Sequence, residues 1–448
     1  MAATDKGAEG GATTWRFPAA FWAGNTIELF ERAAYYGTFI ALVLYLTDVV
    51  GFTDVEAGWI GALFSSFLYL LPFVTGAAAD RIGFRPSLML AFALLAGGYA
   101  TLGLMPRKLP VLLALPVIVV GGAFVKPIIS GTVAKCSDAV NRARAFSIFY
   151  MVVNIGAFGG KAVAKEVRVL LGLEYVPLYS AGAAVIALAL VALFYWPKKD
   201  EAQPRSAAES LRGLATVLRN YRFLALILIT SGFWVIQGQL YASMPKYVIR
   251  LIGPDASPEW YSNVNSAVVI LLVIPITHLV RRMSATASIG LAMVMVPVSA
   301  VLMALAGLMP TPVHLLGFAV HPLTLMMVVG IAFMALAECF LSPKYLEFAS
   351  KQAPPGQEGL YMGYSHLNTF FAWLFGFIAS GYLLDAFCPD PKKLAAQGLG
   401  PEQIKAAYAH APYLWYTFAV VGAVAFLALV VFKVVTDRQD RAAEAGRD

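Results

Sequence analysis

Three ionisable side chains fall within five residues of a long apolar stretch near the start of the chain. In "NTIELFERAAYYGTF" they are Glu28, Glu31 and Arg32. On a helix that turns about 100° per residue, they share with Tyr35 and Tyr36 one face about 140° wide. Glu28 and Arg32 stand in the favourable i, i+4 order for an ion pair. Such a face can bind an ionic solute or exchange a proton if it borders a wet cavity inside a membrane.

The composition predicts the membrane that this face needs. Of the 448 residues, 59% are hydrophobic and 13% are charged, whereas soluble domains average roughly 25% charged residues. Apolar runs long enough to cross a bilayer recur along the whole chain. The sequence therefore predicts an all-α polytopic membrane protein of the cell membrane, of the bacterial inner membrane type, with the lipid bilayer as a partner.

Charged residues, glycines and prolines divide the chain into twelve predicted spans. The spans cover residues 18–48, 55–79, 86–106, 109–135, 143–171, 175–196, 222–252, 259–281, 285–309, 316–349, 356–387 and 411–434. They form two six-helix bundles, 18–196 and 222–434, joined by a polar cytoplasmic linker, 197–221. Residues 1–17 are expected to be a flexible tail with no signal peptide, and residues 435–448 a second tail.

The basic residues predict the orientation of these spans. Most lysines and arginines outside the spans fall on the side that holds both tails and the linker. The positive-inside rule then places both termini in the cytoplasm. Because topology accounts for the excess of 33 basic over 26 acidic residues, no nucleic-acid partner is expected.

A loop motif connects the second and third spans. "GAAADRIGFRP" places Gly76, Asp80, Arg81, Gly83 and Arg85 on the cytoplasmic side. It resembles the loop signature of the major facilitator superfamily, whose two bundles rock around a central site. The resemblance implies a gating loop, in which the charged residues pin neighbouring helix ends and release them as the bundles move. The alternative is an ordinary turn with positive-inside residues.

Four further stretches resemble proton-dependent oligopeptide transporters, a family within that superfamily. "ELFERAAYY" resembles the first-helix motif, although Ala33 replaces the usual Phe. "FVKPIISGTV" resembles the stretch around a substrate-site lysine, here Lys126. "FYMVVNIGAFGG" resembles a fifth-helix signature and gives Tyr150 and Asn154, and "AECFLSPKYLEFASKQAP" resembles a tenth-helix segment and gives Glu338.

The resemblance implies a site for a di- or tripeptide. Arg32 and Lys126 are expected to take the peptide carboxylate and Glu338 its amine, while Glu28 and Glu31 exchange protons. A zwitterion stripped of water needs opposite charges at its two ends, and Arg can bind a carboxylate bidentately. The competing interpretation is a permanent interhelical salt bridge, although buried pairs stabilise weakly.

Other residues could complete the wall of this site. Aromatic rings suit side chains of varied size, and amides can hydrogen-bond the ligand or bridge helices; packing alone is the alternative for each aromatic. The additional substrate-contact candidates are Tyr35, Tyr36, Tyr150, Asn154, Trp234, Gln237 and Asn265.

The seventh span departs from the family pattern. In "GFWVIQGQLYASMPKY" the family's glutamate aligns with Gly238, so the wall is expected to have an amide and a gap there. In the family this carboxylate is implicated in proton coupling and gating. This departure favours an alternative function, a carrier or exporter of an organic anion or amino-acid derivative, with or without coupling to protons.

A basic stripe follows the fifth span. Lys161 and Lys165 lie on the same face as Tyr150 and Asn154, deeper than an interfacial anchor needs to be. One interpretation is an anion-attracting extracellular vestibule. The other is that both lysines reach the outer surface or pair with Glu166 and a neighbouring carboxylate.

Other classes of protein have less support. The five histidines and three cysteines show no metal-ligand spacing, and no nucleophile motif is present. We expect neither an enzyme nor a metal site or cofactor. A substrate-sensing receptor remains open but would lack a signalling domain. The expected partners are a small-molecule substrate and protons, and the expected assembly is a monomer.

Overall fold

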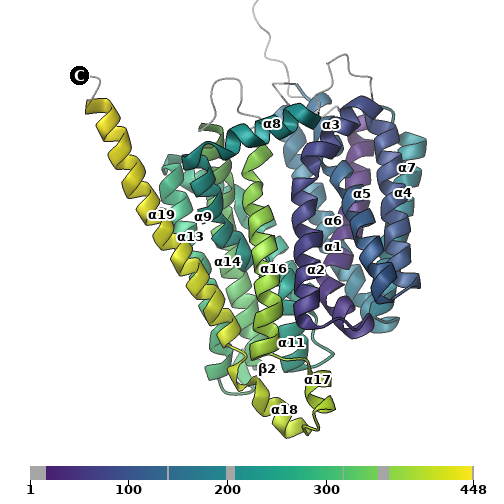
Figure 1. Ribbon diagram of the computed structural model, residues 1–448, viewed down its shortest axis with the longest axis vertical. Coiled ribbons are helices and arrows are strands. Elements are labelled where there is room, and N and C mark those ends of the chain that lie inside the picture. The colour runs from purple at the N-terminus through teal and green to yellow at the C-terminus, as the bar shows by residue number, and fades with distance from the viewer. Residues whose placement is uncertain (1–16, 139–140, 198–206, 316, 352–362, 446–448) are drawn as a thin grey trace, which may run out of the picture.

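The computed structural model describes residues 17–138, 141–197, 207–315, 317–351 and 363–445. Two groups of helices stand side by side and a linker joins them across one end (Figure 1). Within the described residues, eleven helices are long and apolar enough to cross a membrane, or twelve if one bent pair counts as a single span. The predicted all-helical polytopic fold is confirmed.

The first group, the N-terminal bundle, holds the first six spans. Its elements are α1 (Ala19–Leu44) continued by η1 (Tyr45–Val49), α2 (Asp54–Leu70) with α3 (Pro72–Ile82), α4 (Phe84–Leu104), α5 (Lys108–Lys135), α6 (Arg142–Leu170), η2 (Leu173–Tyr175) and α7 (Val176–Phe194). The second span bends by 47° between α2 and α3. The bend falls just before Pro72, which has no N–H to continue the helical hydrogen bonds.

Close packing of α1 and α6 rests on a glycine. A Cβ atom at Gly160 would lie 2.3 Å from the backbone oxygen of Ala33. Only glycine allows the two backbones to approach this closely. This contact brings the charged face of α1 next to the basic stripe of α6.

The second group, the C-terminal bundle, follows the linker helix α8 (Ala207–Leu218). Its elements are α9 (Tyr221–Gln237), α10 (Gln239–Ala242), α11 (Met244–Ile252), α12 (Pro258–Leu279), η3 (Val280–Arg282), α13 (Ala285–Ala304), η4 (Leu305–Leu308), strands β1 (Val313–Leu315) and β2 (Phe318–Val320), α14 (Pro322–Lys351), α16 (Leu367–Phe387), α17 (Pro391–Ala396), α18 (Pro401–Ala407), η5 (Tyr408–His410) and α19 (Tyr413–Ala445). The antiparallel strands pair Val313 with Val320.

Three boundaries differ from the sequence prediction. The seventh span is divided into α9, α10 and α11, with breaks at Gly238 and at Ser243, just before Pro245. The tenth span begins at Pro322 because the residues before it form the β-hairpin.

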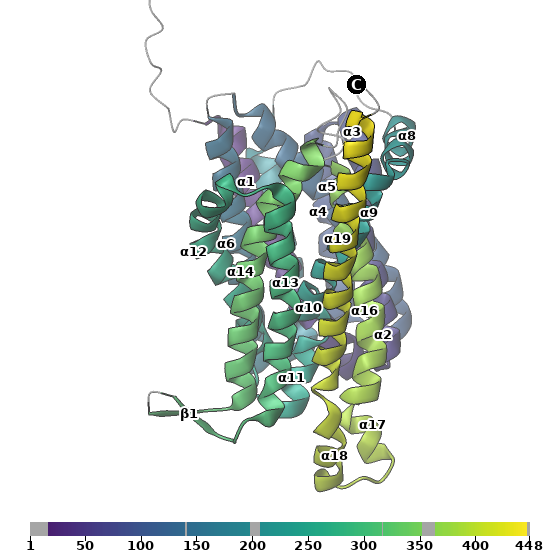
Figure 2. The ribbon, with the colours of Figure 1, turned by 90° about the vertical axis from the view of Figure 1, so that its left-hand side faces the viewer.

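The third difference is at the C-terminus, where most of the predicted tail is helical. Helix α19 continues to Ala445, since the segment after residue 434 is rich in helix-forming residues and has no glycine or proline before Gly446. Figure 2 shows α19 extending past its neighbours, with β1, α17 and α18 at the opposite end of the bundle. Residues 1–16 of the predicted tail 1–17 and residues 198–206 of the predicted linker lie outside the described residues.

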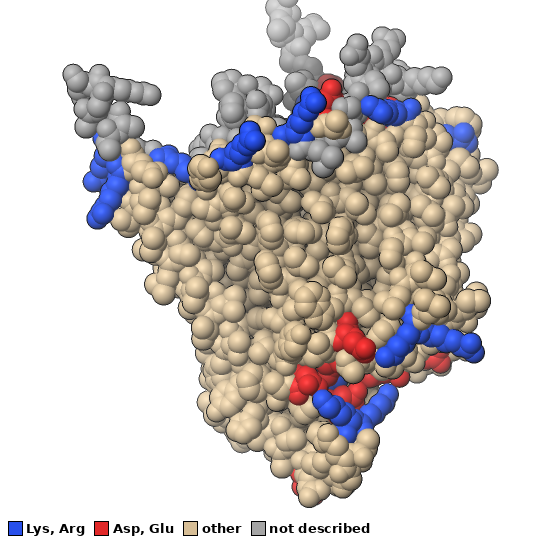
Figure 3. All heavy atoms as spheres, viewed as in Figure 1, with Lys and Arg blue, Asp and Glu red and all other residues tan. Residues whose placement is uncertain are grey.

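The surface agrees with a membrane-spanning protein. In Figure 3, charged side chains gather at the two ends of the visible face, and other residues cover the band between them. We call the end where α1 begins, α19 ends and α8 lies the terminal end, and the opposite end the far end. Lysines and arginines predominate at the terminal end of this face, whereas the far end carries both signs of charge.

Candidate functional site

Arg32 binds both carboxylates of the first-helix motif. Its Nε lies 3.2 Å from Glu28 Oε1 and donates a short hydrogen bond to Glu31. Glu28 is 2% exposed and Glu31 is 3% exposed. The other oxygen of Glu28 is buried with no hydrogen-bond partner among the described residues. The cluster therefore contains one carboxylate more than its single guanidinium neutralises.

Lys126 is the exposed cation of the site. Its ammonium lies 5.0 Å from the centroid of the Tyr69 ring, and it interacts electrostatically with Arg32 and Glu28. Pro127 follows it inside α5 and cannot donate to the carbonyl of Ala123 four residues earlier. Thr75 Oγ1 of α3 donates to that carbonyl at 2.7 Å instead. The Ala123 carbonyl therefore has a hydrogen-bond donor although Pro127 interrupts the helical pattern beside Lys126.

Glu338 forms the opposite pole, on α14 of the C-terminal bundle. Asn265 Nδ2 on α12 donates to its Oε2 at 3.1 Å, and the residue is half-buried. Its charge acts on four tyrosines drawn from both bundles, namely Tyr36, Tyr69, Tyr150 and Tyr241. The two basic residues and Glu338 thus border one region between the bundles.

An aromatic cluster lies between these poles. Tyr36 and Tyr241 have ring centroids 6.0 Å apart, and Phe39 stacks on Trp373 at 5.1 Å. Tyr69 meets Trp373 edge-on at 5.3 Å. Tyr35 joins the cluster through Phe39 at 5.1 Å. Phe39, Tyr69 and Trp373 were not among the predicted contacts, since an aromatic residue on an apolar helix carries no sequence signal that separates a site wall from packing.

Tyr150 and Asn154 lie one turn apart on α6. Tyr150 is 45% exposed, and Asn154 Nδ2 donates to the Tyr150 carbonyl at 2.8 Å. In this conformation the Asn154 amide N–H thus bonds within its own helix, and Tyr150 is the accessible member of the pair.

The predicted gap at Gly238 is filled. A Cβ atom there would lie 3.5 Å from Trp373 Nε1 and 3.1 Å from the carbonyl of Trp234. Gln237 is buried, and its Oε1 has no partner among the described residues. The indole nitrogens of Trp234 and Trp373 are likewise buried without a partner in the described structure. The expectation of an open gap is wrong, because the large Trp373 side chain occupies the space beside Gly238.

The residues of the predicted gating loop lie within the N-terminal bundle. Gly83 ends α3 with φ of +98°, a conformation that favours glycine. Arg85 donates to the Ala192 carbonyl at 2.8 Å and lies 3.6 Å above the Trp196 ring. Asp80 and Arg81 are exposed. A Cβ atom at Gly76 would contact Pro127 of α5 at 3.5 Å. In this conformation the loop attaches to α7.

Lys161 and Lys165 do not form an open vestibule here. Lys161 is 1% exposed and donates to Ser262 and Ser266 of α12. Lys165 pairs with Glu166 at 3.0 Å, as the alternative interpretation anticipated. The two lysines lie one turn apart on α6, yet Lys161 bonds α12 and Lys165 bonds its sequence neighbour.

Ion pairs join the two bundles at the far end. Asp54 of α2 is 4% exposed and accepts from Lys246 at 2.8 Å and from Arg250 at 2.9 Å, both on α11. Arg168 of α6 lies 2.6 Å from Glu259 of α12. None of these pairs was predicted, because their members lie far apart in the sequence.

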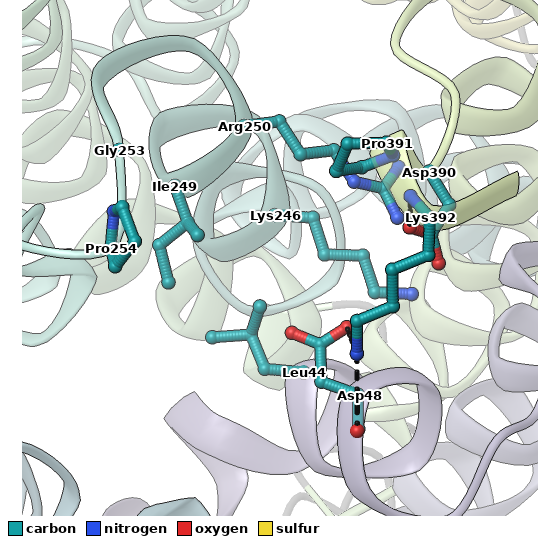
Figure 4. A pocket seen from close by; sticks show the side chains of 10 residues that line it. All are labelled: Leu44, Asp48, Lys246, Ile249, Arg250, Gly253, Pro254, Asp390, Pro391 and Lys392. Atoms are coloured by element: carbon teal, nitrogen blue, oxygen red, sulfur yellow. Dashed lines mark hydrogen bonds and ion pairs between the residues drawn. The ribbon is translucent and has the colours of Figure 1, made fainter. Parts of the chain in front are cut away.

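A small pocket of about 280 Å³ lies beside the Asp54 pairs. Figure 4 shows Lys246 and Arg250 pointing across it toward Asp390 and the start of α17, and Lys392 donating to the Asp48 backbone oxygen. That hydrogen bond is 3.3 Å long. Acidic residues of the N-terminal bundle and basic residues of the C-terminal bundle therefore meet beside this pocket.

Sequence comparison identifies relatives over most of the chain. Residues 26–316 match the Major Facilitator Superfamily. The multidrug resistance protein MdtH of Aeromonas hydrophila is 25% identical over 372 residues, which cover 79% of this chain and 89% of that protein. MdtH of Klebsiella pneumoniae (strain 342) is 23% identical over 417 residues, 89% of this chain and 94% of its own.

Solved structures share the fold at lower identity. A POT family transporter in complex with 5-aminolevulinic acid superposes with a TM-score of 0.74, 18% identity and coverage of 94% of this chain and 96% of its own. A peptide transporter POT in complex with sulfate gives 0.72 at 18% identity, with coverage of 94% and 95%. With the sequence match, this shows that the chain belongs to the Major Facilitator Superfamily and is a multi-pass transporter of the cell membrane.

Proposed function

We propose that this protein moves a small zwitterionic solute, a di- or tripeptide, by alternating access and with proton coupling. The observation that carries the proposal is the pair of opposite poles, Arg32 and Lys126 in one bundle and Glu338 in the other, around an aromatic cluster. A zwitterion satisfies both poles at once. Both termini are proposed to be cytoplasmic, and the functional unit to be a monomer of two bundles, 18–196 and 222–434.

The proposal of proton coupling is supported by the contacts of Arg32 Nε with both carboxylates. The Arg32 guanidinium is bound by both Glu28 and Glu31, so an incoming carboxylate competes with them. Protonation of one glutamate weakens its hold on Arg32 and frees donors for the substrate. A proton and a carboxylate are thus favoured to bind together.

The remaining candidates are assigned to recognition. Tyr35, Tyr36, Tyr150 and Trp234 provide amphipathic surfaces for the substrate side chains, and Gln237 has an acceptor oxygen without a partner among the described residues. Asn265 holds Glu338 in place. Asn154 is assigned a hydrogen bond to the substrate, formed once its amide no longer donates to the Tyr150 carbonyl. The loop from Gly76 to Arg85 is assigned to gating in the opposite state.

A second candidate is export of an organic anion or amino-acid derivative. Two observations favour it: Gly238 carries no carboxylate, and the sequence relatives are named multidrug resistance proteins. The structural neighbours are described in complexes with 5-aminolevulinic acid and with sulfate. An anionic cargo requires Lys126 more than Glu338.

The test is uptake of labelled dialanine into liposomes that carry the purified protein, with and without an inward proton gradient. Accumulation that depends on the gradient supports the symporter. Equilibration without accumulation indicates a peptide facilitator. Absence of uptake by folded protein rejects the peptide proposal, and labelled 5-aminolevulinic acid then tests the second candidate in the same liposomes.

A further inference from the structure

Lys161 is a buried cation whose role the transport site leaves unexplained. It lies on α6, past the middle of the helix toward the far end, with 1% of its surface exposed. Its ammonium donates to Ser266 Oγ at 3.1 Å, Ser262 Oγ at 3.2 Å and the Ser262 carbonyl at 3.3 Å. All three acceptors are neutral and belong to the other bundle.

No negative charge compensates this ammonium. Among the described residues, no carboxylate forms an ion pair with Lys161, and its one aromatic contact is the Tyr36 ring, 5.8 Å away. A buried charge without a partner carries a large desolvation penalty. The neighbouring Arg168 shows the contrast, because it lies in the same α6–α12 seam and is paired with Glu259.

Several titratable groups on the elements around Lys161 bond residues other than Lys161. Glu28 and Glu31 bind Arg32, and Tyr261 bonds Thr324. The titratable and charged groups on α1, α5, α6, η2, α7, α10 and α12 around this seam include Glu28, Glu31, Arg32, Tyr35, Tyr36, Lys126, Tyr150, Lys165, Glu166, Arg168, Glu174, Tyr175, Tyr179, Tyr241, Glu259 and Tyr261.

In this structure the far end is closed, and the seam around Lys161 is part of that closure. Asn263 Nδ2 donates to the Phe158 carbonyl at 3.2 Å, one turn from Lys161. Together with Arg168–Glu259, these contacts join antiparallel α6 and α12 along about three turns. Separation of the bundles at the far end therefore removes the serines and exposes the ammonium to water.

From this arrangement we propose that Lys161 is a proton-binding site whose occupancy controls the far end of the transporter. With the far end open, Lys161 is hydrated and carries its proton. Closure places it against neutral acceptors, so the closed form is favoured by release of that proton. The inference rests on the proposed alternating access and adds a cationic proton site to the glutamates of α1, in a protein whose seventh span lacks the family's carboxylate.

The sign of the pH response follows directly. The closed form binds fewer protons than the open form, so a rise in pH favours closure. The equilibrium constant between the two forms changes by up to about tenfold per pH unit. This change is expected at pH values below the ordinary lysine pKa of about 10.4.

The experiment measures the far-end distance between spin labels at Leu171→Cys and Gln397→Cys, exposed positions in opposite bundles. It uses the full chain in liposomes, without added substrate, across about pH 6 to 10. Cys136→Ser removes the half-buried native thiol, and Cys339 and Cys388 are buried. We expect the short-distance population to grow as pH rises.

Variants at Lys161 separate its charge from its packing. Lys161→Gln keeps a donor for the serines without a charge and should remain closed at every pH. Lys161→Arg keeps the charge and should remain open. Lys165→Gln, one turn away in an exposed pair, should respond like the parent. If Lys161→Gln does not fold, Lys161→Met takes its place.

Three outcomes overturn the inference: no pH response in the parent, the parent's response in Lys161→Gln, or equal closure of Lys161→Gln and Lys161→Arg. Each leaves the proposed transport function untouched, because uptake of dialanine is measured separately. Loss of dialanine uptake with an intact pH response has the opposite meaning, namely a proton-controlled transporter of another solute.

Discussion

The two ends of the region between the bundles are built differently. At the far end, buried Asp54 holds two cations of the other bundle, and Arg168 holds Glu259. Toward the terminal end, Lys126 is exposed and Tyr150 is 45% exposed. We infer that solvent reaches the charged poles from the terminal end and that the far end must open to complete a cycle.

The difference indicates which role each set of ionic contacts has in the proposed alternating access. A buried pair contributes little net stability but is costly to leave half-made. The far-end pairs therefore favour complete closure or complete separation with hydration of both partners. The poles of the proposed transport site, by contrast, form no ion pair with each other among the described residues, and we propose that a ligand bridges them.

The largest expected effect is on transport, at the two poles of the proposed site. Glu338→Gln removes the negative pole while keeping the hydrogen bond to Asn265, and uptake of dialanine should fall at least about 100-fold, on the scale of a lost charged contact. Lys126→Ala and Arg32→Ala should lose uptake similarly. Liposome uptake measures this, with monodispersity in detergent as the folding control. Normal uptake by all three variants would reject the assignment of the site.

The next largest effect is expected on the stability of the closed far end. Asp54→Asn leaves Lys246 and Arg250 without their carboxylate and should destabilise the closed form by about 3–5 kcal/mol. Thermal unfolding in detergent and the far-end label distance both report it. The matched control is Glu56→Gln, which breaks an exposed far-end pair with Lys108 but retains the capping box. Equal shifts for the two variants would contradict a special role for Asp54.

A smaller effect is expected for packing within the N-terminal bundle, between α1 and α6. Gly160→Ala forces α6 away from Ala33 and should cost about 1–3 kcal/mol of stability by overpacking. Gly159→Ala, where a Cβ atom meets nothing within 4 Å, should be neutral or slightly stabilising. Thermal unfolding compares them. A neutral Gly160→Ala would mean that α1 and α6 are less tightly joined than described.

The smallest effect is expected at an exposed pair on the same helix. Glu166→Gln removes the partner of Lys165 and should change stability by less than about 0.5 kcal/mol. Uptake and unfolding should match the parent. A large loss of uptake here would revive the interpretation of this stripe as part of the solute path.

The local parts of the site were predictable from the sequence. The i, i+4 spacing of Glu28 and Arg32 predicted an ion pair, and the two side chains lie 3.2 Å apart. Apolar run lengths predicted most span boundaries to within a few residues. The exceptions are the breaks at Gly238 and before Pro245, the hairpin before Pro322, and α19, which continues to Ala445, eleven residues past the predicted end at residue 434.

Contacts between distant spans could not be predicted. The Asp54 pairs depend on how α2 and α11 are rotated about their axes, which periodicity within each helix does not determine. The same holds for Trp373, which fills the space beside Gly238, and for Lys161, whose stripe was evident while its serine partners were not. Helix rotation between bundles is set by packing, for example where Gly58 of α2 meets Gly381 of α16.

The most direct test locks the far end reversibly. Asp48→Cys and Lys392→Cys place thiols on opposite bundles where the native side chains approach within 4.0 Å, and a bis-methanethiosulfonate reagent can join them. Alternating access predicts that joined protein loses dialanine uptake and that a reducing agent restores it, while each single variant is unaffected by the reagent. Uptake that continues at the parent rate in fully joined protein would contradict the requirement that the far end opens.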